Sequence, residues 1–250
     1  MTYAPAERFE ISRVLSRTFG VIARNFPVFA GLALILSGLP SLSLQVYQLG
    51  VLTPTGLGAI APFGLTWIIS ILSSTLLQAA LIHGTVSDLN GRPASLGDCL
   101  QTAIRNLLPL IGVGLATSVA MLFGFLFFIV PGLFLALSLC VSAPAQVVEG
   151  RGVFEAIGRS SDLTRNHRGA ILLLFMLFAV SFVILRGLLE IVPLSLAVAS
   201  IADDIRKLVV TPVFEALSAL VGAAGIASIY FELRTIKEGV GVEALARAFD

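Results

Sequence analysis

The chain has 250 residues, of which 57% are hydrophobic and 12% are charged, and its formal net charge is +1. A soluble domain carries about 25% charged residues, so most of this surface faces something other than water. The near-zero net charge excludes a general polyanion-binding surface, and we expect no nucleic-acid partner. Residues 1–250 are therefore expected to form one integral membrane domain.

The segment before the first apolar run is predicted to be an amphipathic helix. Arg13, Arg17 and Arg24 fall on one stripe at helical spacing, and Val14 and Leu15 belong to an apolar stripe. Such a helix lies in the plane of the membrane interface. No apolar core of a secretory signal precedes it, so the N-terminus is expected to stay in the cytoplasm.

Six apolar runs follow, and crossing a bilayer takes about 20 residues. Turn-rich residues 50–58 separate the first two runs, and Pro131-Gly132 separates the third from the fourth. The segment 193–207 can be a loop, a re-entrant segment or a helix extension, which leaves a five-span alternative open. The predicted spans are about 26–47, 62–83, 107–129, 132–148, 169–191 and 208–231.

The basic residues predict the orientation of these spans. Thirteen of the sixteen Lys and Arg residues lie in four segments that are separated from one another by even numbers of spans. The positive-inside rule places that side in the cytoplasm. We therefore expect both termini to be cytoplasmic.

A short motif recurs three times: an Arg-Asn pair lies at the end of an amphipathic stretch and directly before an apolar run. The pairs are Arg24-Asn25, Arg105-Asn106 and Arg165-Asn166. Three copies with two spans each suggest a parallel threefold pseudo-repeat with three interfacial helices, although basic residues before a span are also ordinary in membrane proteins. In the third copy Glu155 and Arg159 are spaced to pair across a turn. The candidate contacts to lipid headgroups are Arg13, Arg17, Arg24, Arg105, Arg159 and Arg165.

The sequence holds no recognisable catalytic constellation. His83 and His167 fall at the predicted interface without a metal-binding spacing, and Cys99 and Cys140 form no Cys-x-x-Cys motif. We expect no enzyme activity, no cofactor and no metal site.

Three ionisable residues lie within the predicted spans and form the candidate polar site: Arg186, Glu190 and Glu215. Charge inside a membrane is usually paired and often functional. Arg186 and Glu215 have nearly matched depths, which predicts an ion pair across the last two spans. The simpler interpretation is an ion pair that only stabilises the fold. The alternative is that these residues bind a substrate. Gln78 is predicted to make a polar contact between helices.

The order of several short motifs resembles a known family. The motifs lie at 9–19, 91–98, 130–132, 149–164 and 230–239. They look like the membrane domain that is fused to some bacterial glycerophosphoryl diester phosphodiesterases and also occurs alone as a six-helix inner-membrane protein. The resemblance implies a location in the bacterial inner membrane. The soluble catalytic barrel of the fused members is missing here, so the resemblance implies no catalytic residues.

Two classes of function remain. The leading one is a non-catalytic membrane protein that interacts with membrane lipids, organises the membrane or holds another membrane protein. The alternative is a transporter of a small solute or lipid, with its polar site near Arg186, Glu190 and Glu215. A polar cavity between the spans would favour the transporter.

Overall fold

The structure is a computed structural model that describes residues 9–48, 60–191 and 206–238, and within these ranges the regular elements are all helices. Six helical stretches are long and apolar enough to cross a membrane, which confirms the prediction of an all-α six-span bundle. The stretches are Phe26–Val46, Gly64–Leu89, Leu96–Phe127, Ile129–Glu149, Arg168–Leu189 and Lys207–Glu238. The turn predicted at 50–58 and most of the segment 193–207 lie outside the described residues.

The first part of the chain forms α1 (Ile11–Arg24), α2 (Phe26–Ala33), the π-helix η1 (Leu34–Gly38), α3 (Leu39–Gln48) and α4 (Ile60–Leu89). A second π-helix, η4 (Arg206–Val210), precedes α11 (Thr211–Glu238). Each π-helix is followed at the second residue by a proline, Pro40 or Pro212. Proline lacks an N–H, and a π-turn is one way to keep such a helix continuous.

The second part differs from the prediction at two points. Helix α5 (Leu96–Phe127) runs without a break through Arg105-Asn106, so this copy has no separate interfacial helix. Helix α5 packs against α4 and α7. These contacts stabilise the helical conformation of the residues before Arg105 as well as of those after Asn106. The chain turns at Phe128, whose backbone is extended, and α6 (Ile129–Leu139) already contains Pro131 in its first turn, where proline is tolerated. Helix α7 (Ser142–Glu149) completes the fourth span.

The third part consists of α8 (Val153–Thr164) and α9 (Arg168–Ile191). Here the Arg-Asn pair does interrupt the helix, because Asn166 has a left-handed φ of 73°. Asn25 interrupts the first copy with a φ of −110° and a ψ of 20°. The three copies of the pair therefore adopt three different backbone conformations, and the threefold pseudo-repeat stays a prediction.

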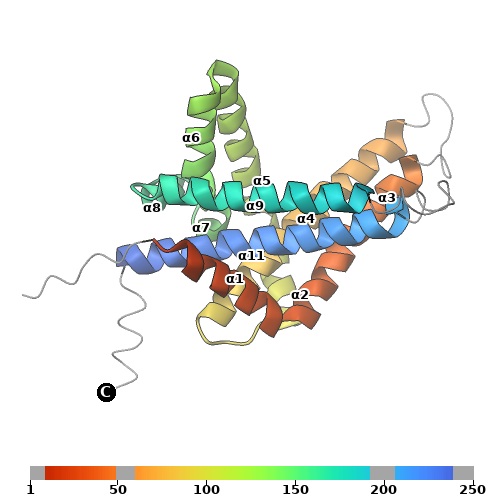
Figure 1. Cartoon of the computed structure of the whole chain (residues 1–250), viewed down its shortest axis with the longest axis horizontal. Coiled ribbons are helices and arrows are strands. Elements are labelled where there is room, and N and C mark those ends of the chain that lie inside the picture. Colours follow the sequence, from red (N-terminus) through yellow and green to blue (C-terminus); the bar gives the residue numbers. More distant parts are fainter. Residues whose placement is uncertain (1–8, 49–59, 192–205, 239–250) are drawn as a thin grey trace, which may run out of the picture.

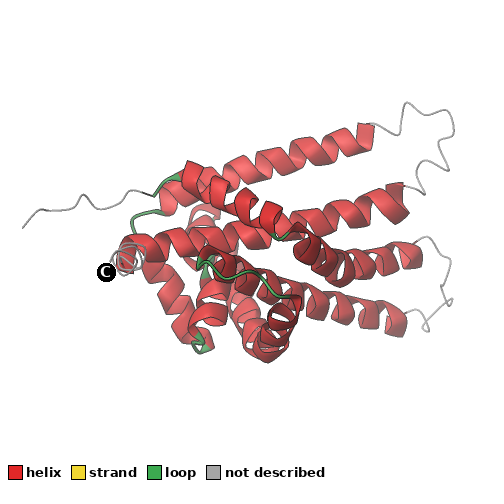
Figure 2. Ribbon diagram, turned by 90° about the horizontal axis from the view of Figure 1, so that it is seen from below, coloured by secondary structure: helices red, strands yellow, loops and turns green. Residues whose placement is uncertain are grey.

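The α5–α6 hairpin leaves the rest of the bundle. It runs across the direction of α9 and α11 in Figure 1, whereas the other long helices lie side by side in the view from below in Figure 2. Its two arms touch through glycines, since a Cβ on Gly132 would lie 2.4 Å from Cδ1 of Phe125. The tip is apolar and exposed, with Val130 at 77%. Lipid is the solvent that such a surface fits.

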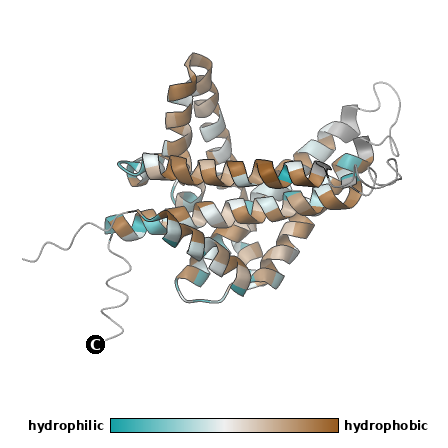
Figure 3. Ribbon diagram, in the orientation of Figure 1, coloured by the Kyte–Doolittle hydropathy of each residue, from teal (hydrophilic) through white to brown (hydrophobic). Residues whose placement is uncertain are grey.

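Polar residues gather at one end of the bundle. Figure 3 shows hydrophilic residues at the C-terminal end of α11, whereas α6 and α9 are hydrophobic along most of their length. We call this the charged end. It includes the C-terminal residues of α11, the helices α1 and α8, and the links that follow α4 and α7.

Candidate functional site: a basic groove beside an ion-pair hub

At the charged end, α1 is fastened to α11 by a buried carboxylate. The side chain of Glu232 is 0% exposed, and Arg13 donates to its Oε1 at 2.9 Å. Arg17 bonds to the second oxygen, and its guanidinium lies 5.2 Å from the centroid of the Phe231 ring. A buried carboxylate requires such partners because its desolvation is unfavourable. The basic stripe of α1 therefore faces another helix in this structure.

The first Arg-Asn pair joins α1 to the end of α4. Nε of Arg24 donates to Asp88 at 3.2 Å, and Nδ2 of Asn25 donates to the same carboxylate at 2.7 Å. The hydrogen bond to Asp88 raises the pKa of Arg24. Oδ1 of Asn25 also accepts from the backbone N–H of Ala94 at 3.4 Å, which positions the link between α4 and α5.

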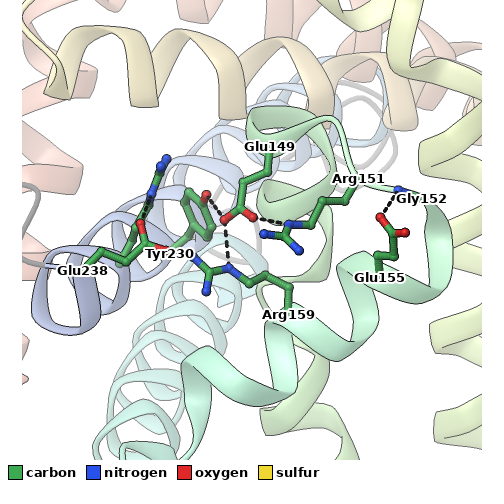
Figure 4. A network of polar contacts seen from close by, with 8 residues as sticks. Glu149, Arg151, Gly152, Glu155, Arg159, Tyr230 and Glu238 are labelled. Atoms are coloured by element: carbon green, nitrogen blue, oxygen red, sulfur yellow. Dashed lines mark hydrogen bonds and ion pairs between the residues drawn. The ribbon is translucent and has the colours of Figure 1, made fainter.

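A second buried carboxylate, Glu149, closes α7 (Figure 4). Its Oε1 accepts from the hydroxyl of Tyr230 at 2.8 Å and from Nε of Arg159 at 3.0 Å, and Arg151 pairs with its other oxygen. Arg159 also pairs with Glu238 of α11. The predicted pairing of Arg159 with its helical neighbour is therefore not observed, because carboxylates of other elements take its donors. Glu155 instead accepts from the N–H of Gly152 at 3.4 Å.

These contacts form what we call the ion-pair hub, defined by Glu149, Glu232 and Glu238 and their arginine and tyrosine partners. The hub fastens α1, α7 and α8 to the end of α11. It engages three of the six arginines that were predicted to contact lipid headgroups, and a fourth pairs with a carboxylate outside the hub. Arg13, Arg17 and Arg159 bind hub carboxylates, while Arg24 binds Asp88. Arg105 and Arg165 are exposed and, in the described part of the chain, have no carboxylate partner.

A groove of about 1210 Å³ lies beside the hub, between α4, α5 and α7 with the links that follow α4 and α7. Its lining includes Arg92, Arg105, Arg151 and His83 next to the apolar side chains of Leu108 and Pro109. Arg151 is held by Glu149, whereas Arg92 and Arg105 pair with no carboxylate among the described residues. Glu149 also lines the groove, so its lining combines three arginines and one carboxylate, an excess of positive charge, with an apolar wall.

The second Arg-Asn pair contributes the wall of this groove. Nδ2 of Asn106 donates to the carbonyl of Thr102 at 2.9 Å, and Oδ1 of Asn106 accepts from Nε2 of Gln146 at 3.0 Å. Gln146 is 2% exposed, and its Oε1 has no partner among the described residues. Both Asn106 and Gln146 line the groove.

A smaller cavity of about 340 Å³ lies one or two turns further along the same helices, at the base of the diverging hairpin. Gln78 of α4, Thr117 of α5 and Ser142 of α7 line it, and Phe175 of α9 and Ile226 of α11 close its other side. Gln78 thus faces a cavity between helices rather than a close-packed seam.

The intramembrane residues predicted to form a polar site are placed differently. Arg186 lies over the ring of Phe214, 5.8 Å from its centroid, and Glu215 accepts a hydrogen bond from Ser41 of α3. The contacts described for Arg186 and Glu215 join them to different partners, and the ion pair between them stays a prediction. Equal depth alone does not decide it, because Ser41, which donates to Glu215, belongs to α3. Glu190 lies in α9, and its side chain is outside the described part of the structure.

The two histidines and the two cysteines noted in the sequence lie in different surroundings. Burial, with Lys237 nearby, lowers the pKa of His167, whose ring lies 6.1 Å from that of Phe9. Cys99 and Cys140 are free thiols. In the described ranges no three His, Cys, Asp or Glu side chains gather as metal ligands would.

Sequence reasoning missed Arg92, His83 and Gln146 as members of one groove. Arg92 and Arg105 bracket the segment between two spans, and Gln146 interrupts an apolar run one turn before Glu149. A search for polar residues at matching depth on successive spans would have selected Asn106 and Gln146.

The six spans make this chain a multi-pass integral membrane protein. No family model, no curated protein and no solved structure matches it. The resemblance to the phosphodiesterase-associated membrane domain therefore stays a prediction.

Proposed function

We propose that this chain is a non-catalytic protein of the bacterial inner membrane whose groove binds an anionic lipid headgroup. The observation that carries the proposal is the groove itself, in which Arg92 and Arg105 have no carboxylate partner within the described ranges and Leu108 and Pro109 provide an apolar wall. Juxtamembrane arginines attract anionic headgroups. An anionic lipid can contact both the arginines and the apolar wall, whereas a small hydrophilic anion contacts only the arginines.

The proposal includes an orientation. The positive-inside rule assigns the charged end to the cytoplasm, so the groove would open at the level of the inner-leaflet headgroups. Reporter fusions after Gln48 and after Lys207 are expected to read as external. A cytoplasmic reading at either position would contradict both the orientation and the six-span topology.

Lipid binding is tested with the purified protein in nanodiscs that contain phosphatidylglycerol. Each basic residue near a membrane surface contributes about 1 kcal/mol, so the double variant Arg92→Gln, Arg105→Gln should bind phosphatidylglycerol about thirty-fold more weakly. The matched control is Arg165→Gln, because Arg165 is also exposed and pairs with no carboxylate in the part of the chain that the structure describes, but does not line the groove. Equal retention by the double variant and the control in native mass spectrometry would overturn the proposal.

Transport is the second candidate, and the smaller cavity favours it. Polar groups of Gln78, Thr117 and Ser142 face a space between spans, at greater depth than the groove. A transporter needs such a polar position near the middle of the membrane. Flux of phospholipid or of a small solute in proteoliposomes, abolished by Gln78→Leu, is the expected result for this candidate. The phosphodiesterase-associated family would accommodate either role.

A further inference from the structure

The hydrogen bonds of the groove wall have a fixed direction. The carbonyl of Thr102 can only accept, so the amide NH₂ of Asn106 must face it. Oδ1 of Asn106 then faces Gln146, and the NH₂ of Gln146 must donate to it. The reverse orientation of either amide would place two acceptors or two donors against each other. This chain of bonds turns Oε1 of Gln146 away from Asn106.

That oxygen is a buried acceptor without a donor in the described residues, on a side chain that is 2% exposed and lines the groove. Leaving such a group unpaired is unfavourable, because the group has lost its hydrogen bonds to water without gaining others. Thr85 and Ser228 also carry buried hydroxyl oxygens without partners. Neither lines the groove, and a hydroxyl can rotate to suit its surroundings, whereas the Gln146 amide is held by Asn106.

We infer that Gln146 is a specificity-determining residue, whose Oε1 accepts a hydrogen bond from a hydroxyl of a bound phosphodiester headgroup while Arg92 and Arg105 hold its phosphate. The inference rests on the proposed lipid-binding function and adds the class of headgroup to it. An anionic headgroup with a free hydroxyl fits all three residues. A headgroup of equal charge without a donor leaves Oε1 unpaired.

Two lipids of equal charge and acyl chains separate these cases. Dioleoyl phosphatidylglycerol carries two hydroxyls on its headgroup, and dioleoyl phosphatidylmethanol carries none. The native protein should bind the first about tenfold more tightly than the second, since one buried hydrogen bond accounts for about 1.4 kcal/mol. Binding is measured by titrating each lipid into the detergent-solubilised full chain and counting bound lipid by native mass spectrometry.

The variant Gln146→Met should bind both lipids with the affinity that the native protein shows for phosphatidylmethanol. Because this change also strands Oδ1 of Asn106, a second variant, Asn106→Leu with Gln146→Met, removes both polar groups together. Replacing both partners by apolar side chains is close to neutral for stability. Loss of the tenfold preference in the double variant, with unchanged binding of phosphatidylmethanol, supports the role of Gln146.

The possible outcomes test the role of Gln146 separately from lipid binding in the groove. Equal binding of the two lipids by the native protein, with loss of both in Arg92→Gln, Arg105→Gln, overturns the role of Gln146 and leaves the groove as a lipid site. Undiminished binding of both lipids by the arginine double variant overturns the lipid site itself. Displacement of phosphatidylglycerol by millimolar glycerol phosphate would show that the groove takes soluble esters, which also overturns the lipid assignment.

Discussion

The ion-pair hub and the basic groove contain the same kinds of residue in opposite arrangements. In the hub every arginine has a carboxylate, and Glu232 is completely buried between its partners. In the groove Arg92 and Arg105 have none among the described residues. They share two boundary residues, Glu149 and Arg151, which form an ion pair of the hub and also line the groove.

The difference shows why arginine content alone does not indicate where a membrane protein binds lipid. A guanidinium that is satisfied by a buried carboxylate contributes to holding helices together. One that makes no ion pair with a carboxylate retains its attraction for an external anion. Arg13 and Arg105 illustrate the two cases, and the following predictions separate them by stability and by binding.

The largest expected effect is in the hub. Glu232→Leu leaves Arg13 and Arg17 without their common partner, and breaking a buried pair in this way is typically unfavourable by about 3–5 kcal/mol. Because both arginines retain some exposure, a loss of about 3 kcal/mol in the free energy of unfolding is expected. Unfolding by SDS titration in mixed micelles measures it. Glu155→Gln is the control, since its exposed carboxylate makes one long hydrogen bond. A Glu232→Leu variant as stable as this control would show that the hub does not hold α1.

A smaller effect is expected at a second hub carboxylate, Glu149. Tyr230→Phe removes the 2.8 Å hydrogen bond to Glu149 and leaves Arg159 and Arg151 in place. A hydrogen bond to a charged group contributes about 1.5–3 kcal/mol, and the remaining partners should limit the loss to the lower end. The same titration measures the loss. A drop as large as that of Glu232→Leu would mean that Glu149 depends on Tyr230 alone.

Salt should distinguish the two regions without any mutation. Raising NaCl from about 0.1 M to about 1 M shortens the Debye length from about 10 Å to about 3 Å. Phosphatidylglycerol binding in the groove should fall several-fold, because its arginines are exposed. The free energy of unfolding should change much less, because Glu232 is shielded from solvent. Native mass spectrometry and SDS titration on one preparation give both quantities, and parallel losses would contradict the distinction.

The sequence was sufficient to predict the spans but not their ends. Long charge-free apolar runs favour a bilayer, and each predicted span overlaps an observed one, although the observed third span begins at Leu96 instead of about 107 and the sixth extends to Glu238 instead of about 231. Helix ends depend on neighbours that a local pattern does not contain. The pair Arg105-Asn106 lies inside α5, while Asn25 and Asn166 interrupt their helices.

The contacts of the charged residues were the least predictable part. The helical period of α1 showed a basic stripe, but Glu232, which that stripe faces, lies more than 200 positions away in the chain. Depth along a helix predicted a meeting of Arg186 with Glu215. The rotation of α11 decides that Phe214 faces Arg186 and that Glu215 faces Ser41. Depth can be counted from sequence, whereas rotation requires the packing.

The smallest effect concerns pH at the edge of the hub, where His167 and Lys237 lie near each other. Burial first, and then the positive charge of Lys237, lowers the pKa of His167 below its ordinary value of 6.5. The unfolded chain therefore binds a proton more readily than the folded one, so the stability that neutral His167 permits is present above about pH 6.5 and is lost as the pH falls below it. Acidification from about pH 7.5 to about pH 5.5 should lower the free energy of unfolding of the native protein more than that of His167→Gln. Carboxylates that titrate over this range contribute equally to the loss in the native protein and in His167→Gln, so the difference between the two losses reports on His167. Equal losses would mean that His167 keeps its ordinary pKa in the folded protein. Neither burial nor the charge of Lys237 would then act on this histidine.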